Sequence, residues 1–338
     1  MVHVGTRPRA ALPAAIGVVA LLLASCVTGA TTAPAPPSGP PLTASMVPTS
    51  ATPTEAGPTR APEAILGAFD VGGKGWSMTK AGDALWIQVD PPIDAIVRVD
   101  ATTGATMTVA PAGRKAKSGP EGLWVQTATF LARLDPESGA ETLRVPIEGQ
   151  AQFALAEGSA WLLDGEELHR IDAETGAIAD SIATAASAEC ADHKELAVAF
   201  ESAWLACAEG FVIRIDLETG DTTAITADWG AHTFAITPDA VWVTNYEQGT
   251  VSRIEPETNE VTTVEDAGWG VGITTGGGYV WAAAERGIAK IDPESRAIVG
   301  TVHLGYGQYY ELVWDEGVIW ASTRQSKILK VDPTKLEP

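Results

Sequence analysis

From residue 65 onward the chain alternates short apolar runs with polar turns, and one such outline recurs seven times. Each copy contains a tryptophan between aliphatic neighbours, as in VWV at 241–243. Short runs with apolar residues on both faces predict strands that are covered on both sides. Successive tryptophans are 38, 37, 43, 38, 39 and 39 residues apart. They are Trp86, Trp124, Trp161, Trp204, Trp242, Trp281 and Trp320.

A second apolar strand follows each tryptophan strand and ends in a basic, an aliphatic and an acidic residue, as in VIRID (212–216). A turn such as DLETG comes next, and its glycine suits a left-handed position in a short hairpin. Two weaker strands complete each copy, as in QFALAEG (152–158) and AIVGTVHLG (297–305). Four strands in each unit of this length, repeated radially, predict the blades of a β-propeller.

The two ends of the repeat region determine the number of blades. The segment EAILGAFDVGG (63–73) has the pattern of an outer strand, yet it precedes the first tryptophan strand. The last copy ends at LKVDPTKLEP without an outer strand of its own. We therefore predict an all-β fold over residues 65–338, a seven-bladed propeller with four-stranded blades whose ring is closed by the N-terminal outer strand.

The fifth copy carries a family resemblance. VWVTN followed by GTVSRIEPETN resembles the YVTN repeat of YncE-like seven-bladed propellers of bacteria. The outline of the repeats is also similar to that of the streptogramin B lyase group. The resemblance covers residues 65–338 and implies the propeller fold, whereas these blade-forming residues are poorly specific for any activity.

Residues 1–25 have the features of an export signal. Arg7 and Arg9 precede an apolar run that ends in LLLASC (21–26), which resembles a bacterial lipobox. The resemblance implies a lipid on Cys26, and the alternative is a secreted protein that loses Cys26 with its signal. Residues 26–64 are rich in Pro, Thr and Ala, with nine of the 22 prolines of the chain in 27–62, and we interpret them as a disordered linker. The expected location is the cell membrane, lipid-anchored on its extracytoplasmic face.

The formal net charge of −21 argues against a nucleic-acid partner and against docking on anionic lipid. Loss of Arg7 and Arg9 with the signal would leave 20 basic against 43 acidic residues, a charge of −23. We expect contact with the membrane through the lipid anchor only, and a monomeric protein.

The two cysteines of the propeller region fall at one end of a predicted hairpin. Cys190 precedes the predicted strand 195–200, and Cys207 lies in its partner strand 203–208. In an oxidising compartment these residues can form a disulfide, which would close a loop of about 16 residues and stabilise the fold by roughly 3 kcal/mol. The alternative is a buried free Cys207 and an exposed Cys190.

The repeat tryptophans and the basic and acidic residues of the third strands are interpreted as structural, because every blade needs them. Other aromatic residues fall in connections that a propeller places on one rim of its central channel, where they suit a small molecule, a glycan or an envelope protein. The candidates for ligand binding are Trp76, Trp229, His232, Tyr246, Trp269, Tyr306, Tyr309 and Tyr310. In the alternative they pack between blades, or Trp76 and Trp269 plug the channel of a purely structural module.

The leading hypothesis is therefore a binding or scaffold module that needs no cofactor. The rival is a metal-dependent lyase or hydrolase acting on a small cyclic substrate, as the streptogramin B lyase resemblance implies. Its candidate residues are His193, His232 and Glu311, with a divalent metal as cofactor. We expect no His-x-Glu pair at a rim position, and this departure from the lyase pattern weakens the enzymatic hypothesis.

Overall fold

The computed structural model describes residues 63–111, 113–147, 151–305 and 309–336, and it contains seven four-stranded antiparallel sheets. These residues belong to the second of two units into which the chain divides, residues 58–338. No helix among them is long and apolar enough to cross a membrane. The innermost strands of the sheets are β2 (Gly75–Ala81), β6 (Lys115–Gly119), β10 (Gln152–Ala156), β14 (His193–Ala199), β18 (Ala231–Thr237), β22 (Ile273–Gly276) and β26 (Tyr309–Asp315).

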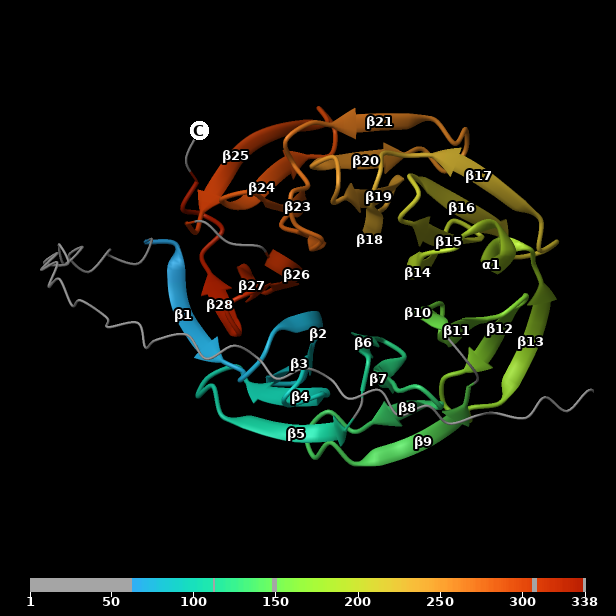
Figure 1. Cartoon of the computed structure of the whole chain (residues 1–338), viewed down its shortest axis with the longest axis horizontal. Helices are drawn as coiled ribbons and strands as arrows, with labels where there is room; N and C mark the ends of the chain where they lie inside the picture. The colour runs from blue at the N-terminus through green and yellow to red at the C-terminus, as the bar shows by residue number, and fades with distance from the viewer. Residues whose placement is uncertain (1–62, 112, 148–150, 306–308, 337–338) are drawn as a thin grey trace, which may run out of the picture. The chain divides into compact units, whose positions relative to one another are not determined.

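Each innermost strand contacts the innermost strand of the next sheet, and β26 contacts β2, so the sheets close into a ring (Figure 1). The second strands carry the repeat tryptophans. They are β3 (Ala84–Val89), β7 (Gly122–Gln126), β11 (Ser159–Asp164), β15 (Ser202–Cys207), β19 (Ala240–Asn245), β23 (Tyr279–Ala284) and β27 (Val318–Thr323). The third strands are β4 (Ala95–Asp100), β8 (Phe130–Leu134), β12 (Glu167–Asp172), β16 (Phe211–Asp216), β20 (Thr250–Ile254), β24 (Gly287–Asp292) and β28 (Lys327–Val331).

The outer strands confirm the predicted closure of the ring. Six of them follow the third strands of their own blades: β5 (Thr106–Pro111), β9 (Glu141–Pro146), β13 (Ile178–Ala183), β17 (Thr222–Thr226), β21 (Val261–Val264) and β25 (Ala297–His303). The seventh is β1 (Ile65–Asp70), which pairs antiparallel with β28 at the other end of the propeller. The last blade therefore contains strands from both ends of the repeat region, as predicted, and the all-β seven-bladed fold is confirmed.

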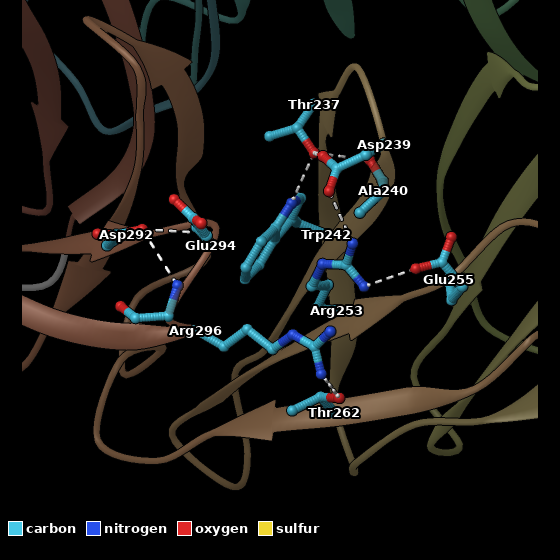
Figure 2. Close-up of polar contacts among 11 residues, drawn as sticks. Thr237, Asp239, Ala240, Trp242, Arg253, Glu255, Thr262, Asp292, Glu294 and Arg296 are labelled. Carbon is cyan, nitrogen blue, oxygen red and sulfur yellow. Dashed lines mark hydrogen bonds and ion pairs between the residues drawn. The ribbon is translucent and has the colours of Figure 1, made fainter.

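Each repeat tryptophan is buried, and in five of the seven blades a basic residue of the third strand lies over its ring. In the fifth blade the Arg253 guanidinium carbon is 5.9 Å from the centre of the Trp242 ring. Arg253 is 5% exposed and forms ion pairs with Asp239 (2.8 Å) and Glu255 (3.1 Å), as Figure 2 shows. The indole N–H of Trp242 donates to Thr237 Oγ1 at 3.1 Å. These residues hold the blade together, in agreement with the structural interpretation.

The acidic residue that ends most third strands organises the following turn. Asp216 Oδ1 accepts hydrogen bonds from the backbone N–H groups of Glu218 and Thr219, at 2.9 and 2.8 Å. These bonds lower the pKa of Asp216 below its usual value, because they stabilise the carboxylate. Gly220 completes the turn with a φ of 77°, a left-handed conformation that glycine adopts without a steric penalty.

The VWVTN segment shows how neighbouring blades are joined. Thr244 is fully buried, and its hydroxyl donates to the backbone oxygen of Val271 in the next blade at 2.9 Å. Ser322, at the same position of the seventh blade, donates to the oxygen of Gly75 in the first blade at 3.0 Å. Gln126 donates in the same way to Ala151 at 2.7 Å. In these three blades the polar residue two positions after the tryptophan therefore links adjacent blades.

The long fourth repeat contains the short helix α1 (Ala186–Glu189) before β14. Cys190 follows this helix, and Cys207 ends β15. The two cysteines form a disulfide with a Cα–Cα distance of 5.7 Å, and both are buried. The predicted hairpin brings them together, because His193 and Cys207 are partners in the ladder between β14 and β15.

Candidate functional site

Four of the seven blades have a bulge at the same place, close to the start of the innermost strand. The ladder between the first two strands skips from Gly75 to Met78 in the first blade and from His193 to Leu196 in the fourth. The fifth and seventh blades repeat the irregularity at 231–234 and 309–312. A bulge sets two residues opposite one and redirects side chains.

The bulges bring pairs of consecutive residues to the centre of the ring. There a cavity of about 360 Å³ is lined by residues from all seven innermost strands, and we call it the channel cavity. The four bulged pairs in its wall are Trp76–Ser77, Lys194–Glu195, His232–Thr233 and Tyr310–Glu311. In an unbulged strand, consecutive residues point to opposite faces. The bulges therefore place both residues of each pair in the wall of the cavity.

A second pocket of about 460 Å³ adjoins the channel cavity and shares lining residues with it, including Trp76, His232 and Tyr310. We call it the mouth pocket. The rings of Trp76 and Tyr310 lie 4.1 Å apart, centre to centre, at an angle of 35°. The indole N–H of Trp76 donates to the Asp90 carboxylate in the turn between β3 and β4, which holds the ring in place. The remaining wall includes Tyr246 and charged residues.

Two lysines of β6 extend into the channel cavity. Lys117 Nζ forms an ion pair with Glu195 Oε1 at 2.6 Å, which joins the second blade to the fourth. Lys115 Nζ donates instead to Gln152 Oε1 at 3.0 Å and to the backbone oxygen of Lys194 at 3.3 Å. Both acceptors of Lys115 are uncharged, and burial lowers its pKa to about 8.

The acidic residues of the cavity differ in their protonation. The pKa of Glu311 is raised well above its usual value, first by burial and then by the negative charge of Glu195. The pKa of Glu195 is lowered because the positive charges of Lys117 and Lys115 outweigh its burial. Burial also lowers the pKa of His232 to about 4. At neutral pH the cavity therefore contains a neutral Glu311, a neutral His232 and an ionised Glu195.

The channel cavity is electropositive although the chain as a whole carries a net charge of −21. Four cationic side chains line it, and two of them are ion-paired, Lys117 with Glu195 at 2.6 Å and Lys194 with Asp192 at 2.7 Å. The cations are Arg114, Lys115, Lys117 and Lys194. Charges of one sign in a cleft with low-dielectric walls raise the local concentration of ligands of the opposite sign.

The sequence-predicted ligand residues divide into two groups. Trp76, His232 and Tyr310 line both the channel cavity and the mouth pocket, and Tyr246 lines the mouth pocket. The two spaces lie beside Trp76, which forms part of the wall of each.

The other predicted ligand residues line neither space. Trp229 is 56% exposed, and Trp269 lies against Gly249 in the turn between β19 and β20. Tyr309 is 2% exposed in the core of the seventh blade, because it precedes the bulged pair and faces away from the channel. Tyr306 lies outside the described residues.

The catalytic candidates are only partly brought together. His232 and Glu311 line the channel cavity, whereas His193 does not, and the His193 Nε2 atom lies 3.3 Å from the Ser187 backbone oxygen. The expectation that no His-x-Glu pair stands at the rim was wrong, because residues 193–195 read His-Lys-Glu. The bulge separates the two side chains, so that Glu195 alone lines the cavity.

Metal ligation by several of these side chains at once requires their donor atoms to be close together. Among the described residues, one group of three His, Cys, Asp or Glu donors lies within 4.8 Å, and it consists of Cys190, Cys207 and Glu209. Its two sulfur atoms are joined in the disulfide and are not available as thiolates. His232, Glu195 and Glu311 share the channel cavity but do not form such a group.

Sequence reasoning missed Lys115, Lys117 and Glu195. The signal was present in the sequence. When the repeats are aligned on their tryptophans, Lys115 and Lys117 fall two residues apart on one innermost strand, and Glu195 falls at the position that corresponds to Lys115. Lys117 is paired with Trp124, and the corresponding partner of Trp204 is Ala197. Charged residues at such positions face the channel in a propeller, where they are unusual unless they have a role.

Comparison with solved structures supports the fold. Virginiamycin B lyase from Staphylococcus aureus superposes with a TM-score of 0.61 at 15% identity, over 79% of this chain and 98% of that one. BamB from Moraxella catarrhalis gives 0.52 at 17% identity, over 76% of this chain and 84% of that one. The computationally designed protein Ika8 gives 0.56 at 12% identity, over 80% of this chain and 99% of that one.

Identities this low show that the chain shares the propeller fold of these proteins, and the fold alone. No protein-family model matches the sequence. The comparison with curated proteins gives no significant match either. The function must therefore be argued from the channel cavity and the mouth pocket.

Proposed function

We propose that the protein is a binding module that recognises a small molecule in the channel cavity and the mouth pocket. The observation that supports this proposal is the Trp76–Tyr310 pair, which lines a cavity of about 360 Å³ together with charged side chains. Ligand sites are concave, of roughly 300–1,000 Å³, and combine aromatic walls with a few polar groups that orient the ligand. The cavity has all of these properties.

A small molecule fits this site better than a glycan chain or an envelope protein. Most of the polar groups lie on the innermost strands, which surround the centre of the ring (Figure 1). The exposed Trp229 and Trp269 lie outside both spaces and leave the rim open to a second, larger partner. We therefore assign the primary ligand to the cavity.

The aromatic pair gives a direct test. A library of small molecules and sugars is screened by thermal unfolding, and each ligand found is titrated by calorimetry into Trp76→Ala, Tyr310→Ala and a Trp229→Ala control. Ligand binding to the native state raises the unfolding temperature by mass action. We expect affinity to fall at least tenfold in the first two variants and to stay unchanged in the control. Equal affinities in all three variants would refute the proposal.

We further propose that this module is held at the extracytoplasmic face of the membrane by a lipid on Cys26 and belongs among the YVTN-type bacterial propellers. The lipobox-like LLLASC and the Pro-rich segment after it support anchoring, and the disulfide between Cys190 and Cys207 suits an oxidising compartment. Cys26 and the linker lie outside the described residues. Cys26→Ser should move the protein from the membrane fraction to the soluble fraction, and retention in the membrane would contradict anchoring.

A further inference from the structure

The channel cavity contains a lysine whose charge has no anionic partner. Among the described residues no carboxylate oxygen lies within 4.0 Å of Lys115 Nζ, whose acceptors are the Gln152 amide oxygen and the Lys194 backbone oxygen. The neighbouring Lys117 is neutralised by Glu195 at 2.6 Å. Because both of its acceptors are neutral, the charge of this half-buried ammonium group can still pair with an anion.

Glu311 supplies a second group that favours an anion. Glu311 lines the same cavity as Lys115, and a hydrogen bond from the Leu312 backbone N–H acts on its carboxyl group. Among the described residues this carboxyl group forms no ion pair. The raised pKa of Glu311 leaves it protonated at neutral pH, and a protonated carboxyl group donates a hydrogen bond. Both residues line the channel cavity, where one ligand can contact them together.

The aromatic pair defines the other end of the ligand. Trp76 lines the channel cavity and the mouth pocket, with its indole N–H bound to Asp90, so its ring face is available to a ligand. Tyr310 packs against it at 4.1 Å. Such rings bind flat or apolar groups through their faces.

We propose that the channel cavity binds a small organic monocarboxylate through Lys115, with the flat part of the ligand against Trp76 and Tyr310. This inference rests on the proposed function and adds the chemical class of its ligand. A carboxylate accepts hydrogen bonds and donates none, which matches an ammonium group and a protonated carboxyl group. The negative charge of such a ligand can pair with the Lys115 ammonium group, whose two hydrogen-bond acceptors are neutral.

The test compares matched probes on the full chain. Benzoate and indole-3-carboxylate are titrated by calorimetry at pH 7 beside benzamide, indole-3-carboxamide and phenyl phosphate. We expect the carboxylates to bind saturably, at least tenfold more tightly than the amides of the same shape and more tightly than phenyl phosphate. Equal affinity for acids and amides, tighter binding of the phosphate, or no binding of either carboxylate would overturn the proposal.

Two lysine variants locate the interaction. Lys115→Met should weaken carboxylate binding at least tenfold. Lys80→Met is the control, because Lys80 also lies on an innermost strand but pairs with Asp315 at 3.0 Å and lines a different pocket. Carboxylate affinity that is unchanged in Lys115→Met would refute the assignment. The probe comparison on the unmodified protein decides the matter if that variant fails to fold.

The outcomes separate this inference from the proposed function. If neutral ligands bind with an affinity that depends on Trp76 and carboxylates do not bind, the proposed binding function stands and the monocarboxylate proposal is refuted. Carboxylates that bind independently of Trp76 and Tyr310 would contradict the aromatic site of the proposed function instead.

Discussion

Thr244→Val isolates the hydroxyl group that joins the fifth blade to the sixth. Valine has nearly the shape of threonine, so the change removes the hydrogen bonds without opening a cavity. The Thr244 hydroxyl donates to the Val271 oxygen at 2.9 Å and accepts the backbone N–H of Thr233 at 3.2 Å. The variant therefore leaves the Thr233 N–H at the bulge of β18 and the Val271 oxygen before β22 without this partner.

The structure indicates the size of the effect. An unmade hydrogen bond costs about 1–3 kcal/mol for each buried group. Thr233 and Val271 line the channel cavity, so water in the cavity can replace part of the loss. We therefore expect the free energy of unfolding to fall by about 2 kcal/mol, near the lower end for two groups. In a domain of this size, this corresponds to a fall of about 4–8 °C in the unfolding temperature.

Urea unfolding at pH 7 measures the change, with a slope that should match the unmodified protein. Thr142→Val is the matched control, because the Thr142 hydroxyl also donates to a backbone oxygen, that of Arg133 at 3.1 Å, but on the exposed strand β9. Its effect should stay within about 0.5 kcal/mol. Ser322→Ala should reproduce the larger loss in the seventh blade. A loss below about 0.5 kcal/mol in Thr244→Val would refute the role of this hydroxyl in joining blades.

Three further outcomes are expected. Reduction of the Cys190–Cys207 disulfide, which spans a separation of 17 residues, should lower the free energy of unfolding by about 3 kcal/mol, and an unchanged unfolding temperature in reductant would contradict this. Glu311→Gln should stabilise the fold at pH 7 and give no gain below pH 4.5. At pH 7 the folded state keeps a proton on Glu311, whereas the unfolded chain releases it above the ordinary glutamate pKa of 4.5, so folding carries a cost that glutamine removes. A destabilised variant at pH 7 would contradict this. His232→Gln should reduce the loss of stability between pH 6.5 and about 4, because the folded state disfavours protonated His232, and an unchanged pH profile of urea unfolding would contradict this.

The sequence predicted the architecture because each blade is encoded by local patterns. The strand around Trp242 and the turn after Asp216 could each be predicted from their own segments. Apolar residues on both faces predict a buried strand, and a glycine at the left-handed position predicts the turn. Ring closure by β1 followed from a missing outer strand in the last copy. Strand bounds agreed to within a few residues, since β10 and β25 lie within the predicted segments 152–158 and 297–305.

The candidate site could be predicted only in part. Trp76, Tyr310 and His232 were identified because they are aromatic or titratable residues outside the repeat pattern. Tyr309 has the same sequence signal as Tyr310 but is buried in the blade, because the bulge begins one residue later. A pattern of residue types does not reveal which of two adjacent residues a bulge turns toward the channel.

The sequence alone determined a propeller of seven four-stranded blades, because the periodicity and turns that encode a blade lie within one repeat. The tertiary structure alone decided the chemistry of its channel. Lys117 and Glu195 are 78 residues apart in the chain, yet the closed ring brings their charges to 2.6 Å. The same closure buries Glu311 and brings it within the influence of the Glu195 charge, and both effects raise its pKa, which no local pattern of residues specifies.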